Sequence, residues 1–154
     1  MGGRTTLAAA VAGLLLLSAD TQVVTAAQES PLVGVWQLDA SQTGFAGVYI
    51  FTSTHYSMIA AGKDRPDIAD TSKATADELR SIWGPMLANA GTYEIAADLL
   101  TIRPIVAKIP VVMKPGAYEV YRFRADGNTL TLTQVRNARG PVDHGGTTRL
   151  VRVP

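Results

Sequence analysis

"YRFRADGNTLTLT", residues 121–133, predicts a β-hairpin. Asp126 and Gly127 supply residue types that readily adopt the positive φ of a tight turn, and runs of alternating or β-branched residues lie on either side of them. Side chains alternate across a strand, so Leu130 and Leu132 share one face of the sheet and the neighbouring threonines share the other. The segment therefore predicts paired strands with one apolar face.

Short segments of the same kind, bounded by turn residues, recur along the chain and give eight candidate strands. Closing such a series into a barrel removes its exposed edges, and an eight-stranded barrel has room for packed side chains or one small ligand. The sequence predicts an all-β fold, an eight-stranded antiparallel up-and-down barrel. The candidate strands are Val33–Asp39, Phe45–Ser53, Thr54–Ala60, Thr92–Ala97, Leu99–Lys108, Ala117–Ala125, Asn128–Gln134 and Thr147–Val153.

One segment, "TADELRSIWGPMLANAG" at residues 75–91, has helical rather than alternating spacing of its apolar residues. Thr75 and Glu78 form a capping-box pattern at its start, and Gly91 is placed to end it. We expect one inserted amphipathic helix, kinked at Gly84-Pro85, whose apolar face packs on the sheet or over an open barrel end. A structural plug and a moving lid are both compatible with this pattern.

The first 27 residues have the pattern of a secretory signal peptide rather than of folded structure. Arg4 precedes an apolar run, Leu7–Leu17, which is too short to span a bilayer, and small residues lead to a cleavage site near Ala27. The chain has no cysteine, which excludes both a lipid-anchored lipobox and a disulfide framework. We expect an exported periplasmic or extracellular protein whose single domain comprises residues 28–154, with no membrane span.

The charge distribution gives no sign of nucleic-acid binding. The formal net charge is +1, although residues 28–98 carry four Lys/Arg against nine Asp/Glu and residues 99–154 carry nine against three. In one folded domain we expect these halves to compensate each other across the surface.

The inventory of residues for catalysis and metal binding is small. The only histidines, His55 and His144, have no recognisable motif around them and are expected at the surface. Asp64, Asp67 and Asp70 do not have the spacing of a calcium-binding loop. We therefore expect no catalytic residue, no metal and no cofactor.

The stretch "PIVAKIPVVMKPG", residues 104–116, is too apolar for an ordinary exposed turn, and its three prolines interrupt regular strand pairing. Two interpretations remain open. The segment forms a portal for an apolar ligand, or it packs beneath the predicted helix.

The first strand carries a glycine and a tryptophan two residues apart. Gly34, Trp36 and Leu38 share one face, so the indole can point into the barrel where the glycine permits close approach of the chain. Gly34-Val35-Trp36 resembles the G-x-W motif that opens lipocalins and related calycin barrels. The order of "GVYIFTSTHYSMIAAGKDRP", the kinked helix, "GTYEI", the hairpin and "TTRLVRV" is similar to the lipocalin-like domain family over roughly residues 32–153.

This resemblance implies a closed barrel with an inner cavity. It also implies that a basic residue of the last strand covers the tryptophan, and Arg149 is the candidate. Fatty-acid-binding relatives end in an inward Arg-x-Tyr pair, but here Val151 takes the second position, so a fatty-acid carboxylate site is not expected.

Three functions are compatible with such a barrel. The first is binding or carriage of a small apolar molecule, the second is a cofactor-free cyclase or isomerase that holds a hydrophobic substrate in the same cavity, and the third is a packed structural barrel without a ligand. Arg149 could stack on Trp36 or hold an acidic ligand. The candidate cavity residues are Trp36, Tyr49, Phe51, Tyr56, Tyr93, Tyr121, Phe123 and Arg149.

Overall fold

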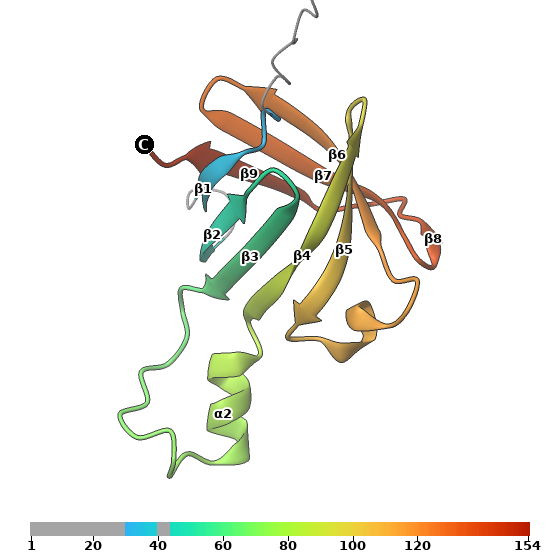
Figure 1. The fold of residues 1–154 in the computed structure, drawn as a ribbon. Coiled ribbons are helices and arrows are strands. Elements are labelled where there is room, and N and C mark those ends of the chain that lie inside the picture. Colours follow the sequence, from blue (N-terminus) through green and yellow to red (C-terminus); the bar gives the residue numbers. More distant parts are fainter. Residues whose placement is uncertain (1–29, 40–43) are drawn as a thin grey trace, which may run out of the picture.

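The computed structural model describes residues 30–39 and 44–154, and the predicted signal peptide, residues 1–27, lies outside them. The described chain forms a closed eight-stranded antiparallel barrel with one α-helix between the third and fourth strands, which confirms the predicted fold class (Figure 1). The elements are β1 (Gly34–Leu38), β2 (Phe45–Phe51), β3 (His55–Gly62), α2 (Ala76–Trp83), β4 (Met86–Ala96), β5 (Leu99–Ala107), the 3₁₀ helix η1 (Pro110–Met113), β6 (Glu119–Asp126), β7 (Thr129–Asn137), β8 (Gly140–Pro141) and β9 (Thr147–Arg152).

The barrel follows the order of the chain. From β1 to β7 each strand pairs with the next, and β9 pairs with both β7 and β1 and so completes the ring, while the two-residue β8 pairs only with the end of β7. The predicted hairpin at residues 121–133 joins β6 to β7 with Asp126 opposite Thr129. Its left-handed turn residue is Gly127, with φ of +55°.

One end of the barrel is filled by packed side chains. Trp36, Leu100, Leu130 and Leu150 are each fully buried there, and the Phe51 ring meets the Tyr93 ring edge-on with centroids 5.5 Å apart. We call this the closed end. The opposite end is formed where β3, β5 and β7 finish and β4, β6 and β9 begin, and it faces α2 and η1 (Figure 1). We call it the open end.

The predicted helix is shorter than expected and does not cover the barrel. Its capping box is present, because the Glu78 backbone N–H donates to Thr75 Oγ1 at 3.3 Å and the Thr75 N–H donates to the Glu78 carboxylate at 2.7 Å. The helix ends at Trp83, however, and no residue of α2 is buried. The expectation that its apolar face packs on the sheet or over the barrel end is therefore wrong, and α2 projects below the barrel (Figure 1).

Gly84-Pro85, predicted as a kink within the helix, is instead the point where the helix ends and the chain continues into a strand. Proline lacks the N–H that would continue the helical hydrogen bonds, and the residues after it pair with β3 instead, from Met86 opposite Ala61 to Thr92 opposite His55. The strand expected to start at Thr92 therefore starts at Met86. The apolar residues at 86, 87 and 90 have the right spacing for a helix, but the β3 ladder determines their conformation.

The last strand has the opposite register from the one expected. β1 pairs Trp36 with Arg152 and Leu38 with Leu150, so Thr148, Leu150 and Arg152 face inward and Arg149 faces outward. Arg149 instead lies 3.7 Å from the Asp39 carboxylate on the outer surface. The assignment of Arg149 as the residue that covers Trp36 is therefore wrong by one position.

Arg152 takes that place. Its guanidinium lies 4.2 Å from the centre of the Trp36 ring and donates to the carbonyls of Val33 at 2.8 Å and Pro31 at 3.1 Å. Gly34 makes room for it, because a Cβ on this residue would lie 2.5 Å from Arg152 Nη1. With the Trp36 indole N–H donating to Leu32 O at 2.7 Å, the Gly34–Trp36 pair and Arg152 together seal the closed end.

Within the described residues, no helix combines the length and the apolar composition that crossing a bilayer requires.

Candidate functional site

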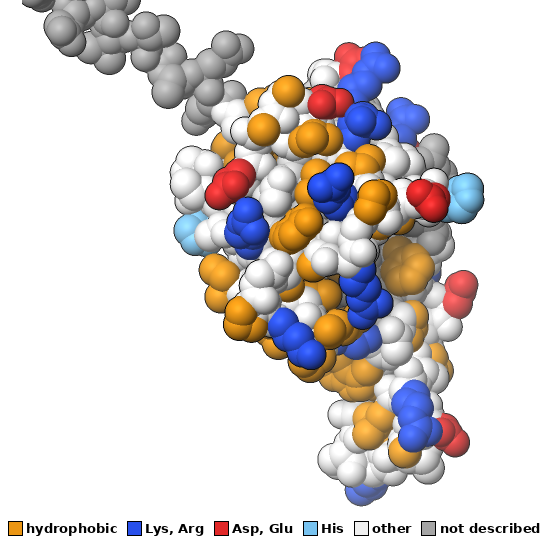
Figure 2. Space-filling model, turned by 90° about the vertical axis from the view of Figure 1, so that its right-hand side faces the viewer, with side chains coloured by type: hydrophobic (Ala, Val, Ile, Leu, Met, Phe, Trp, Pro, Cys, Tyr) orange, Lys and Arg blue, Asp and Glu red, His pale blue; other side chains and the backbone are white. Residues whose placement is uncertain are grey.

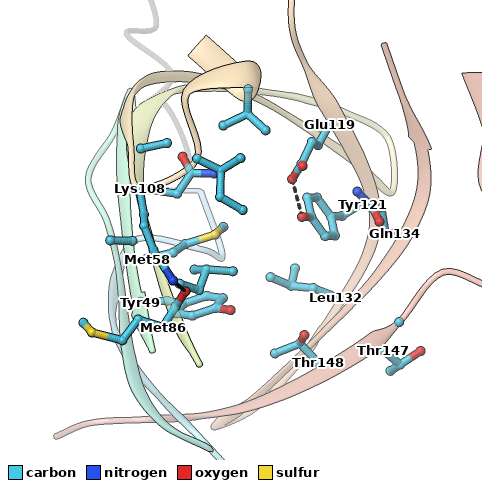
Figure 3. Close-up of a pocket in the computed structure, with 17 residues that line it drawn as sticks. Tyr49, Met58, Met86, Lys108, Glu119, Tyr121, Leu132, Gln134, Thr147 and Thr148 are labelled. Carbon is cyan, nitrogen blue, oxygen red and sulfur yellow. Dashed lines mark hydrogen bonds between the residues drawn. The ribbon is translucent and has the colours of Figure 1, made fainter. Parts of the chain in front are cut away.

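A cavity of about 380 Å³ occupies the open end of the barrel. Figure 3 shows its walls converging from opposite sides of the barrel, with Tyr49 and Met58 across from Tyr121 and Leu132. Much of its wall is apolar, contributed by Met58, Met86, Leu87, Ile109, Val112 and Leu132. The polar side chains that reach it include Tyr49, Asn89, Glu119, Tyr121, Gln134 and Thr148.

The segment before and within η1 forms part of this wall. Ile109 and Val112 line the cavity, whereas Ile105 and Val106 on the preceding strand are 65% and 61% exposed. Of the two interpretations of residues 104–116, packing beneath the helix is not what the structure shows, because no residue of α2 is buried. The segment lies at the cavity mouth, where a portal would be.

The outer surface around this segment mixes apolar and basic side chains. Figure 2 shows hydrophobic side chains interspersed with Lys and Arg across one whole face of the barrel, without a continuous patch of one charge.

A carboxylate projects into the cavity from the first residue of β6. Glu119 and Tyr121 are two residues apart on that strand and so face the same side, and the Tyr121 hydroxyl donates to Glu119 Oε2 at 2.6 Å (Figure 3). Gln134, opposite Tyr121 on β7, brings an amide to the same wall. A β-bulge in the ladder between Val120 and Tyr121 lies directly beside this group.

The phenols near this carboxylate remain neutral at physiological pH. Burial, and then the negative charge of Glu119, raise the pKa of Tyr49 to about 12. The same two causes raise the pKa of Tyr56, whose hydroxyl donates to Asn89 Oδ1 at 2.5 Å. Burial is also the largest cause of the raised pKa of Tyr121, followed by the charge of Glu119 and the hydrogen bond to it. These hydroxyls therefore act as hydrogen-bond donors or acceptors and not as bases.

A second charged group, Lys108, lies on the other wall, and its ammonium is already occupied. Its Nζ donates to the carbonyls of Gly84 at 2.8 Å and Met86 at 3.1 Å and also contacts the Trp83 carbonyl. These bonds tie the end of β5 to the residues that leave α2. Two of the acceptors, the Trp83 and Gly84 carbonyls, belong to the end of the helix, where backbone carbonyls lack intrahelical partners.

The residues predicted from the sequence divide between the two ends. Tyr49 and Tyr121 line the cavity, and Tyr56 is buried next to it through its bond to Asn89. The others do not reach it: Trp36, Phe51 and Tyr93 are buried at the closed end, Phe123 packs against that core, and Arg149 lies outside.

Sequence reasoning missed Glu119, Gln134 and most of the apolar wall. The alternation that leads from Phe123 through Tyr121 also includes Glu119, but the inward residues predicted on this strand were only the two aromatic ones. The two histidines are both exposed, and within the described residues the His55 ring bonds only its neighbour, with Nδ1 2.8 Å from Thr54 Oγ1. Among the residues that the structure describes, no three His, Asp or Glu side chains gather as metal ligands.

Comparison with models of protein families, with curated proteins and with solved structures found no significant match to this chain.

Proposed function

We propose that this chain is an exported, lipocalin-like protein that binds a small, largely apolar molecule in the open-end cavity. The cavity itself carries the proposal. Its volume of about 380 Å³ falls in the lower part of the ~300–1,000 Å³ range typical of ligand pockets. An apolar wall with a few convergent polar groups is the usual composition of such pockets.

The closed end supports the same interpretation. The two largest fully buried side chains, Trp36 and Phe51, pack the half of the barrel away from the cavity. The open end keeps its space although Met58 and Leu132, both almost fully buried, stand in its wall. A barrel with no ligand has no need of this space, so the cavity weighs against the packed-barrel alternative.

Blocking the cavity tests the proposal. Thr148 faces inward from β9 and lines the cavity, whereas Val151 on the same strand is 42% exposed on the outer face. We expect Thr148→Trp to abolish saturable binding of a neutral, environment-sensitive apolar dye and Val151→Trp to leave it unchanged. Urea unfolding of both variants checks that they are folded. Equal dye binding by the wild type and Thr148→Trp would reject the cavity as the binding site.

The enzyme alternative rests on one observation, the contact between Glu119 and Tyr121 inside the cavity. A carboxylate and a neutral phenol together can accept and donate protons, as an isomerase or cyclase requires. Chromatography with mass spectrometry of the molecule retained by protein purified from its own host separates the two functions. A binding protein returns one bound compound unchanged after incubation, whereas an enzyme converts it to an isomer of equal mass.

Export is supported by the sequence pattern of residues 1–27 alone. The intact mass of the secreted or periplasmic form should correspond to a chain that begins at or near Gln28. A full-length mass, or one that includes acyl chains, would reject this part of the proposal.

A further inference from the structure

We propose that the cavity selects a ligand that carries an organic cation, such as a protonated amine on an apolar body, and that Glu119 is its counter-ion. This inference rests on the proposed function, because it assigns a chemical class to the molecule in the same cavity.

The Glu119 carboxylate has unused hydrogen-bonding capacity. A carboxylate accepts through two oxygens, yet among residues 30–39 and 44–154 Glu119 accepts only from the Tyr121 hydroxyl, on Oε2. No buried side-chain oxygen or nitrogen among the described residues is left without a partner, so Oε1 is open to the cavity or its mouth and is not enclosed in the core. Figure 3 shows the carboxylate directed inward beside Tyr121.

No protein cation neutralises this charge in the part of the chain that the structure describes. Glu119 takes part in none of the ion pairs there. Lys108 is the other charged residue of the cavity wall, but its three ammonium hydrogens are matched by the carbonyls of Trp83, Gly84 and Met86. Arg139 and Glu119 both line a neighbouring outer pocket, but the two side chains form no ion pair.

The same arrangement disfavours anionic ligands. An incoming carboxylate would meet a like charge at Glu119 in a partly desolvated site and would find the ammonium of Lys108 already bound. The effect of the Glu119 charge extends across the cavity, since it contributes to the raised pKa of Tyr49 on the opposite wall.

The aromatic side chains around the carboxylate also suit a cation. The rings of Tyr49 and Tyr121 line the cavity, and a cation near a tyrosine ring face is attracted by its quadrupole. A primary ammonium placed at Glu119 Oε1 would leave its alkyl portion for the wall formed by Met58, Leu132 and Val112. The expected ligand is therefore an amphiphile of one positive charge, small enough for about 380 Å³.

Three eight-carbon ligands that differ in the charge of their head group test the preference for a cation. They are octylammonium, octanol and octanoate, each titrated against the bound neutral dye. We expect octylammonium to displace the dye at a concentration about tenfold or more below that of octanol, because a charge-assisted hydrogen bond replaces a neutral one. Octanoate should be the weakest of the three.

Two substitutions assign the preference to Glu119. Glu119→Gln keeps the size of the side chain and removes its charge, so the ratio between octylammonium and octanol should fall to near one while octanol binding persists. Glu94→Gln makes the same change on the exposed outer face of β4 and should leave the ratio as in the wild type. Tyr121→Phe removes the hydroxyl but keeps the charge, and should keep the preference.

The outcomes separate this inference from the function on which it rests. If the dye and octanol bind but octylammonium has no advantage, or if Glu119→Gln keeps the advantage, the cation assignment is overturned and the cavity remains a binding site for neutral molecules. Failure of the dye and of all three octyl compounds to bind would overturn both. A preference for octanoate would also refute the role of Glu119.

Discussion

Replacing Arg152 by leucine should destabilise the barrel far more than the same replacement of Arg149. Arg152 connects the last strand to the chain before β1, through the carbonyls of Val33 and Pro31, and covers the Trp36 ring at 4.2 Å. Leucine removes all three contacts and leaves the Val33 carbonyl, at 2.8 Å from Nη1, without this donor. All three contacts lie at the closed end, where β9 pairs with β1, so their loss should weaken the pairing that closes the barrel.

The expected magnitude follows from the kind and burial of each contact. A hydrogen bond from a charged donor contributes ~1.5–3 kcal/mol when shielded and less at a partly exposed site. A cation–π contact adds ~0.5–2 kcal/mol. Arg152 is only half-buried and leucine recovers some apolar contact, so we expect Arg152→Leu to lower the free energy of unfolding by about 2–4 kcal/mol. Arg149 makes a partly exposed ion pair with Asp39 at 3.7 Å, and its loss should cost less than about 1 kcal/mol.

Urea unfolding monitored by tryptophan fluorescence measures both variants, since Trp36 reports directly on the closed end. Arg152→Lys is an informative third variant, because lysine keeps the charge but loses the planar fork that contacts two carbonyls and the ring together. We expect its stability to lie between those of the wild type and Arg152→Leu. Equal losses for the two leucine variants, or a larger loss for Arg149→Leu, would refute the register of the last strand and the stacking on Trp36.

The remaining predictions concern a glycine and the buried phenols. Gly34 has φ of +136°, and the Cβ of an alanine there would lie 2.5 Å from Arg152 Nη1, so Gly34→Ala should lower the free energy of unfolding in urea by about 1–3 kcal/mol. Gly146→Ala is the matched control, because an added Cβ there meets open space. Equal losses for the two variants would contradict the steric argument. The pKa of Tyr49 is raised from 10.0 to about 12, so the folded state holds the phenol proton more tightly than the unfolded state. The stability that this proton contributes is complete below pH 10 and should be lost as the pH rises toward 12. A free energy of unfolding of the wild type that stays constant from pH 9 to 12 would contradict this prediction.

Much of the barrel could be predicted because alternation determines strand faces where one face is clearly apolar. Leu130 and Leu132 are buried and the threonines between them lie on the other face, as their spacing indicates. The last strand lacks such a bias. Both of its faces carry an arginine and an aliphatic residue, so the sequence of β9 alone fits either register. Pairing with β1, which places Leu150 opposite Leu38, determines which arginine faces inward.

At the end of α2, too, the local sequence is not enough to distinguish a helix from a strand. Met86 and Leu87 continue the helical spacing of Leu79 and Ile82, but they also suit a strand whose partner is available. A proline marks the break without saying which structure follows it. The decisive interaction is long-range, the ladder between β3 and β4, and no local pattern contains it.

The candidate site was harder to predict than the fold, because its central residue departs from the rule that identifies inward positions. Inward faces are found from apolar side chains, and a carboxylate at the start of a strand has the character of a solvated residue. Glu119 is inward because β6 keeps its alternation from Phe123 through Tyr121. A polar residue on an otherwise apolar alternating face is thus the informative exception in such a sequence.

The two ends of the barrel explain why such an exception is tolerated. An inward carboxylate is costly where it is desolvated, and within the described residues the Tyr121 hydroxyl is the one protein donor to Glu119. The closed end supplies the packing that offsets it, with Trp36 fully buried beneath Arg152 and the core leucines around it. In the part of the chain that the structure describes, Glu119 uses one oxygen for a bond within the protein and leaves Oε1 without a donor. A carboxylate oxygen without a protein donor, at the cavity of an otherwise well-packed barrel, is available to a ligand that donates hydrogen bonds, and this is the role that we propose for it.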